Sequence, residues 1–205
     1  MFRELSDMNP GVPVSMLLAS RRILVLGPSG SGKSHFSARL ARILDVGVIH
    51  LDAAFWKPGW VSTPADEWDA VVKDLVSNDS WIMDGTYERS LHLRVPAAEL
   101  VILFESRRWA CLWRVVKRKL FEDRLGRVDA PPGQPINRAF LRYIWNYPRL
   151  TRPAVLESIK EHGRQETVLV LKGPREAIRL LQLLREHVGS FGRSPALVLG
   201  QPARL

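Results

Sequence analysis

The most constraining feature of the sequence is the loop Gly27–Ser34, which reads Gly-Pro-Ser-Gly-Ser-Gly-Lys-Ser and follows the apolar run Ile23–Leu26. The G-x-x-x-x-G-K-[ST] spacing between a buried strand and a helix is typical of a phosphate-binding loop. Glycines let consecutive backbone N–H groups approach an anion, and the helix that follows adds its positive end. We therefore expect Lys33 to reach the β- and γ-phosphates of a nucleotide and the Ser34 hydroxyl to bind Mg²⁺.

The residues after the loop predict a parallel sheet. Phe36, Leu40 and Leu44 recur at helical spacing, and a second apolar run over residues 46–51 ends at Asp52. Strand, helix and strand in about 30 residues form a βαβ unit. Because ligands of such sheets bind outside the carboxyl ends of the strands, Asp52 is a candidate to bind an acceptor or to orient or deprotonate its hydroxyl.

Two tryptophans, Trp56 and Trp60, flank the Pro58-Gly59 turn that follows Asp52. Their rings can form a flat wall for a substrate, or they can simply cover the edge of the sheet. The sequence leaves both interpretations open.

The run Trp81–Met83 predicts a third strand, which ends at Asp84 with a glycine next. A carboxylate in this place, downstream of a phosphate loop, suits a hydrated Mg²⁺, although a simple turn aspartate is the alternative. Arg89 and Arg94 follow shortly and are candidates to clamp an anionic acceptor.

A basic helix is expected over residues 107–120, after a fourth strand at residues 100–104. Its apolar stripe comprises Trp109, Leu112, Trp113, Val116 and Leu120, while Arg107, Arg114 and Arg118 share another face. Three interpretations remain open for this helix. The arginines close over transferring phosphates, or they bind nucleic acid with interleaved tryptophans, or they form a solvated face.

Composition favours one globular domain. The 205 residues are 46% hydrophobic and carry a formal net charge of +9, which favours polyanionic partners without choosing among them. Residues 1–18 and 189–205 are rich in proline and glycine and predict a disordered extension and tail around a domain at residues 19–188. Met16 offers an alternative start to Met1. The single cysteine, Cys111, and the absence of any run near ~18 apolar residues favour a cytoplasmic protein. We expect a monomer or a homodimer.

Specific segments resemble a family of small bacterial proteins called DNA topology modulation proteins, within the adenylate-kinase-like branch of P-loop kinases. They are HLDAAFWKPGW at residues 50–60, WIMDGTY at residues 81–87 and FLRYIWNYPRLTRP at residues 140–153. The resemblance covers about residues 21–187. It implies an α/β, three-layer P-loop kinase fold, with a five-stranded parallel sheet, helices on both faces and a short arginine-rich lid at about residues 119–138. It also places the Asp84 strand beside the phosphate-loop strand.

The resemblance further implies roles for individual residues, with ATP and Mg²⁺ as cofactors. Arg114 and Arg118 are similar to the two arginines where the adenylate kinase lid begins, which face adenine and phosphate, and Arg142 is similar to one where the lid ends. Asp84 is the expected Mg²⁺ partner of Ser34. The expected nucleotide-binding residues are Gly27, Pro28, Ser29, Gly30, Ser31, Gly32, Lys33, Ser34, His35, Lys172 and Gly173.

The sequence thus predicts a phosphotransferase that moves the γ-phosphate of ATP to a small acceptor, a nucleotide or nucleoside among the candidates. Lys33, Asp52, Arg114 and Arg118 are the expected catalytic residues. The alternative is a nucleic-acid-associated ATPase or nucleotide switch that affects DNA topology, which the basic helix favours.

Overall fold

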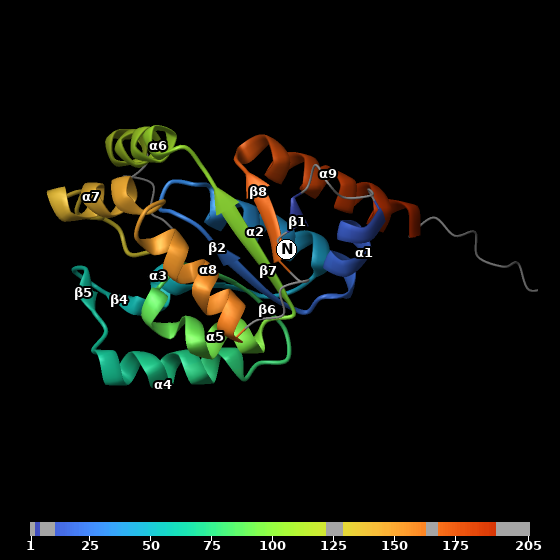
Figure 1. The fold of residues 1–205 in the computed structure, drawn as a ribbon, viewed down its shortest axis with the longest axis horizontal. Coiled ribbons are helices and arrows are strands. Elements are labelled where there is room, and N and C mark those ends of the chain that lie inside the picture. The colour runs from blue at the N-terminus through green and yellow to red at the C-terminus, as the bar shows by residue number, and fades with distance from the viewer. Residues whose placement is uncertain (1–2, 5–10, 122–128, 163–167, 192–205) are drawn as a thin grey trace, which may run out of the picture.

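The computed structural model describes residues 3–4, 11–121, 129–162 and 168–191 (Figure 1). A parallel sheet forms its centre, in the order β1-β8-β7-β2-β6-β3. The bounds of these strands are β1 Arg3–Glu4, β2 Arg22–Leu26, β3 Val48–His50, β6 Trp81–Asp84, β7 Leu100–Glu105 and β8 Val168–Lys172. The five-stranded parallel sheet is confirmed, with the two-residue β1 added at one edge. The Asp84 strand also pairs with the phosphate-loop strand, as expected.

Helices cover both faces of the sheet because the buried strands present apolar side chains on both. Ile23 and Val25 of β2 face a core built with α1 (Gly11–Ala19), α2 (Lys33–Leu44) and α9 (Pro174–Phe191). Leu24 and Leu26 alternate to the opposite face and pack with α4 (Ala65–Val76), α5 (Leu91–Ala97) and α8 (Thr151–His162). The three-layer α/β architecture is therefore confirmed (Figure 1).

The remaining elements gather beyond the carboxyl ends of the strands, on the left of Figure 1. They are α3 (Leu51–Phe55), the hairpin of β4 (Trp56–Lys57) and β5 (Val61–Ser62), the 3₁₀ turn η2 (Glu88–Ser90), α6 (Arg108–Phe121) and α7 (Arg138–Asn146). Residues 122–128, in the middle of the expected lid, lie outside the described part of the chain. None of the described helices is both long enough and apolar enough to cross a bilayer.

The ends of the chain differ from expectation. Residues 11–18, expected to be disordered, form most of α1, and Val14 and Leu17 are buried in the core beside α9. This helix is not evident from the sequence, because proline disfavours helix interiors. Pro13 stands in the first turn, however, where its missing N–H breaks no helical bond. At the other end, α9 continues to Phe191, so residues 189–191 of the expected tail are helical. Residues 192–205 lie outside the described part.

The apolar stripe expected on the basic helix is also corrected. Trp109, Trp113 and Leu120 are exposed, and the residues of α6 that meet the core are Cys111 and Val115. Of the expected stripe, Leu112 packs against Cys111 and Val115, and the exposed Trp109 contacts Trp145 of α7. The face that carries Arg114 looks toward the phosphate loop.

Candidate functional site

The phosphate loop has the geometry that its glycines predict. Gly27, Gly30 and Gly32 have φ values of 148°, 80° and 96°, which side chains rarely allow. A Cβ on Gly27 would lie 2.7 Å from Cβ of Phe104, and a Cβ on Gly30 would lie 2.5 Å from the carbonyl oxygen of Cys111. The loop thus passes too close to β7 and α6 for side chains at these positions, which leaves its backbone groups to line the cradle.

The first turn of α2 completes the cradle. The helix begins at Lys33, so its unpaired N–H groups and positive end face the loop. The buried Ser31 hydroxyl has no hydrogen-bond partner among the described residues. Such an orphaned donor beside a ring of backbone N–H groups fits a bound anion, which supports the nucleotide that the sequence implies.

Thr86 fastens the loop to the end of β6. Its hydroxyl donates to the Gly27 carbonyl at 2.9 Å and lies 3.4 Å from the Gly27 amide nitrogen, which donates to it. The first residue of the phosphate loop is therefore held from the neighbouring strand, and Thr86 is a supporting residue that the sequence did not indicate.

The expected metal ligands lie together. The Ser34 hydroxyl donates to Oδ1 of Asp84 over 3.4 Å, and Asp84 is almost fully buried. The described residues hold no cluster of three acidic, histidine or cysteine side chains. A site with one carboxylate and one hydroxyl still suits Mg²⁺, which keeps several waters and takes its other ligands from substrate phosphates.

His50 is a member of this site that sequence reasoning missed. Its Nδ1 lies 2.7 Å from Oδ2 of Asp84, at the end of the strand next to β6. Burial alone would lower the pKa of His50, but the bond and the charge of Asp84 outweigh it and raise the pKa. The signal in the sequence was its place two residues before Asp52, at the carboxyl end of β3.

Asp52 stands in the first turn of α3, at the same edge of the sheet. The Tyr87 hydroxyl donates to its Oδ1 at 2.7 Å. Burial, followed by the nearby Asp52 charge, raises the pKa of Tyr87 well above its ordinary value. Tyr87 therefore stays neutral and acts as a donor that orients the carboxylate.

Arg94 has a different role from the one expected. Its side chain is fully buried and donates to the carbonyl oxygens of Gly85, Thr86 and Tyr87 and to the Ser90 hydroxyl. Burial lowers the pKa of this guanidinium from its ordinary value. The expectation that Arg94 clamps an acceptor is thus corrected, because its N–H donors bind the backbone carbonyls and the Ser90 hydroxyl near the turn after β6. The sequence could not reveal this, since a buried arginine reads like an exposed one.

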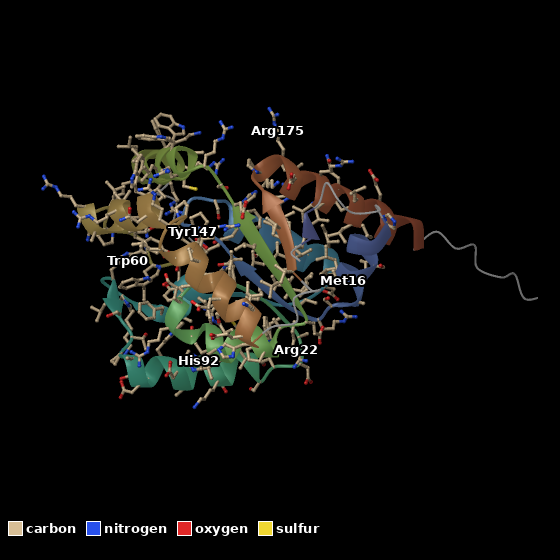
Figure 2. All side chains as sticks on the ribbon, in the orientation of Figure 1. Met16, Arg22, Trp60, His92, Tyr147 and Arg175 are labelled. Carbon is tan, nitrogen blue, oxygen red and sulfur yellow. The ribbon has the colours of Figure 1, made fainter. Side chains whose placement is uncertain are left out.

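Three cavities open around these groups. The phosphate-loop cavity, about 490 Å³, is lined by Ser29, Gly30, Gly32, Lys33, Ser34, His35, Ala38, His50, Asp52, Arg114, Lys117, Arg118 and Asp129. The β7–β8 cavity, about 670 Å³, includes Pro28, Glu105, Arg107, Arg114, Arg152, Lys172 and Gly173 in its lining. The aromatic cavity, about 400 Å³, includes Ser29, Lys33, Asp52, Trp56, Trp60, Tyr87, Glu88, Phe140 and Tyr143 in its lining. Figure 2 shows Trp60 and Tyr147 at this end of the molecule.

The structure thus brings most of the predicted site residues together. Arg114 donates to the carbonyl oxygen of Gly30 at 2.9 Å, and Arg118 donates to Gln134 at 2.7 Å. Arg89 and Arg142 are exposed and line none of these three cavities. A role for these two arginines in acceptor binding stays a prediction.

Comparison with curated proteins includes a partial sequence match. No family model matches the chain. Over 87 residues the chain is 31% identical to the ATP-dependent protease ATPase subunit HslU of Methylobacterium sp. (strain 4-46), which covers 42% of this chain and 19% of that protein. The chain therefore spans about a fifth of the length of this curated relative. The resemblance to the DNA topology modulation family stays a prediction.

Solved structures are similar in fold at low sequence identity. Shikimate kinase from Acinetobacter baumannii, in complex with shikimate, superposes with a TM-score of 0.57 at 14% identity, covering 87% of this chain and 98% of that one. A gluconokinase from Sinorhizobium meliloti 1021 superposes with a TM-score of 0.45 at 17% identity, covering 83% of this chain and 97% of that one. Together with the sheet and the phosphate loop, the first comparison shows that the chain has the fold of a P-loop kinase.

Proposed function

We propose that this chain is an ATP- and Mg²⁺-dependent phosphotransferase that acts on a small-molecule acceptor. One observation carries the proposal: Ser29, Lys33 and Asp52 line both the phosphate-loop cavity and the aromatic cavity. The two cavities therefore meet at the phosphate loop. This is the arrangement that transfer between two bound molecules needs, because the reacting atoms must approach within about 3–3.5 Å.

ATP would lie across two cavities. Its triphosphate fits the cradle of Gly27–Ser34, and its base fits the β7–β8 cavity, where Lys172, Gly173 and Pro28 form part of the wall. Arg114 lines both this cavity and the phosphate-loop cavity, so it spans the path from base to phosphates. Pro28, Lys172 and Gly173 are among the residues expected from the sequence to bind the nucleotide.

In the reaction, an acceptor hydroxyl oxygen forms a bond to the γ-phosphorus while the bond to the β–γ bridging oxygen breaks, and ADP leaves. Lys33, Arg114 and Arg118 neutralise charge that develops on the phosphoryl oxygens. Asp52 orients the acceptor hydroxyl and takes its proton, held in place by Tyr87. Ser34 and Asp84 would hold Mg²⁺, which supplies further charge neutralisation on the phosphates.

The shared fold with a shikimate kinase supports a kinase that acts on a small molecule. Phosphoryl transfer needs cations around the phosphates and an acceptor for the hydroxyl proton, and side chains of both kinds line these cavities. Four cationic side chains, Lys33, Arg114, Lys117 and Arg118, line the phosphate-loop cavity, and Asp52 stands where that cavity meets the aromatic cavity.

The test measures ADP formation from ATP·Mg²⁺ by nuclease-free protein across nucleosides, nucleoside monophosphates, small hydroxy-metabolites and DNA. We expect one class of small acceptor to stimulate ADP release, with a phosphorylated product seen by mass spectrometry. Lys33→Ala should abolish this activity, whereas Lys73→Ala, an exposed lysine on α4, should retain it. Stimulation by DNA alone, or slow hydrolysis indifferent to every acceptor, would instead place the chain among nucleic-acid-associated ATPases or switches.

A further inference from the structure

The β7–β8 cavity and the aromatic cavity differ in the charge of the side chains that line them. Arg107, Arg114, Arg152 and Lys172 line the β7–β8 cavity against a single acid, Glu105. The aromatic cavity is the opposite: among the described residues its lining has two carboxylates, Asp52 and Glu88, and one cation, Lys33. Neither arginine nor histidine is part of that described lining.

The single cation of the aromatic cavity belongs to the phosphate loop. Lys33 also lines the phosphate-loop cavity, where a γ-phosphate would engage it. With ATP bound, the aromatic cavity therefore offers its second ligand two negative charges and no free cation among the described residues. A phosphate or carboxylate on that ligand would meet like charges at short range.

Aromatic rings from three separate parts of the chain line this cavity, and Tyr87 comes from the turn after β6. Trp56 and Trp60 come from the β4–β5 hairpin, and Phe140 and Tyr143 come from α7. Trp60 Nε1 donates to the carbonyl oxygen of Pro132 at 2.8 Å, which ties the hairpin to the loop ahead of α7. Trp60 lies on the side of the molecule where the hairpin and α7 are found (Figure 2).

Ring-to-ring packing holds these walls in place. The Trp56 and Trp60 centroids lie 5.3 Å apart, and Phe55 packs edge-on against Trp56 at 4.9 Å and against Trp68 at 5.0 Å. Phe55 also contacts Tyr87 at 4.8 Å. Such a fixed set of rings suits a flat ligand, because stacking adds binding energy and little side-chain entropy is lost.

Asp52, which lines this cavity, can accept a hydroxyl proton. Oδ1 of Asp52 already receives the Tyr87 hydroxyl, and no bond from the described residues occupies Oδ2. An alcohol hydroxyl of a ligand whose ring stacks in the cavity can therefore donate to Oδ2 of Asp52, next to Lys33 and the phosphate loop.

We propose, on the basis of the kinase function above, that the acceptor is an uncharged molecule that joins a flat ring to an alcohol hydroxyl, as nucleosides and benzyl alcohol do. It carries no phosphate or carboxylate of its own. Asp52 and Glu88 disfavour nucleoside monophosphates and sugar acids in the aromatic cavity. Among the arginines that the structure describes, Arg94 is buried, and Arg89 and Arg142 line none of the three cavities.

The experiment compares ligands that share a ring and differ in charge. A non-hydrolysable ATP analogue with Mg²⁺ fills the donor cavities, and calorimetry then measures binding of thymidine, cytidine, uridine and benzyl alcohol, and of each nucleoside's 5′-monophosphate. At least one uncharged ring is expected to bind, and its monophosphate to bind on the order of tenfold more weakly. Equal or tighter binding of the monophosphate, or binding of none of the uncharged rings, would overturn the proposal.

Two variants with matched controls locate the effect. Glu88→Gln should lower the ratio of the monophosphate Kd to the nucleoside Kd severalfold. Glu157 is an exposed carboxylate on α8, and Glu157→Gln should leave this ratio unchanged. Trp60→Ala should weaken ring binding, while Trp113→Ala on α6 should not. Equal effects of a variant and its control would contradict the assignment of this cavity.

The two proposals fail in different ways. Binding of an uncharged ring without any phosphorylated product would retain the ligand class and remove the kinase function. Phosphorylation of an anionic acceptor would retain the kinase and remove the ligand class.

Discussion

Replacing Arg94 by methionine should destabilise the chain far more than any substitution of an exposed arginine. The buried guanidinium donates to three consecutive carbonyl oxygens, those of Gly85, Thr86 and Tyr87. Methionine keeps most of the side-chain volume but provides no donor. The Arg94→Met variant therefore separates the hydrogen-bonding role of this residue from its packing.

The size of the effect follows from two opposing terms. Each carbonyl left unpaired in the interior costs about 1–3 kcal/mol, or ~3–9 kcal/mol for three. Removing a buried charge returns several kcal/mol of desolvation. The carbonyls remain in place because the turn is fixed between β6 and η2, and we expect a net loss of about 3 kcal/mol in the free energy of unfolding. For a chain of this size, such a loss lowers Tm by roughly 6–12 °C.

Urea titration followed by circular dichroism measures this loss, with Arg89→Met as the matched control. Arg89 lies five residues earlier in an exposed position, so its substitution should change the free energy of unfolding by less than about 0.5 kcal/mol. A loss of under about 1 kcal/mol for Arg94→Met would refute the structural role. If that variant instead folded normally and lost acceptor binding, the clamp expected from the sequence would be right.

Three further predictions concern the support of the site. Gly30→Ala should cost about 1–3 kcal/mol more in unfolding free energy than Gly59→Ala. Both positions have φ near 80°, but only a Cβ at Gly30 would collide with the backbone of Cys111. Equal losses in Tm for the two variants would contradict this. Thr86→Val should weaken ATP binding measured by calorimetry, since the phosphate loop loses its tie to β6; unchanged affinity would contradict it. Burial raises the pKa of Glu99, but two N–H groups at the start of β2 and a neighbouring guanidinium outweigh it, so the pKa is lowered. Glu99→Gln should therefore cost up to about 1 kcal/mol at pH 7, a modest amount for a half-exposed group, and urea titrations should show the difference vanishing as pH falls below about 4.

Local patterns were sufficient to predict the sheet and the phosphate loop. The loop sequence needs glycines at close backbone approaches and a helix behind it, and the structure has both. The positions of Asp52 and Asp84 also followed from the sequence, because the carboxyl ends of parallel strands meet at one edge. His50 shares that edge and was missed, although its place two residues before Asp52 puts it at the same strand end.

Amphipathic patterns were less informative on α6 and α1. The tryptophan stripe of α6 has helical period, but the sequence cannot say whether protein or solvent lies against it, and the structure leaves Trp109 and Trp113 exposed. In α1, Pro13 suggested disorder, whereas packing of Val14 and Leu17 against α9 stabilises a helix. Tertiary contacts decided both outcomes, because burial is a property of the neighbours and not of the segment.

The phosphate cradle, the βαβ unit and the parallel sheet can be predicted from the sequence, because they depend on residues close together in the chain. Which charged groups can reach a ligand depends instead on how distant segments pack in the folded chain. Arg94 is buried on backbone carbonyls, Glu88 lines the aromatic cavity, and Trp60 is tied to Pro132 across 72 residues. The sequence gives the charge of a side chain directly, whereas its partners and its exposure depend on elements that meet only in the folded chain.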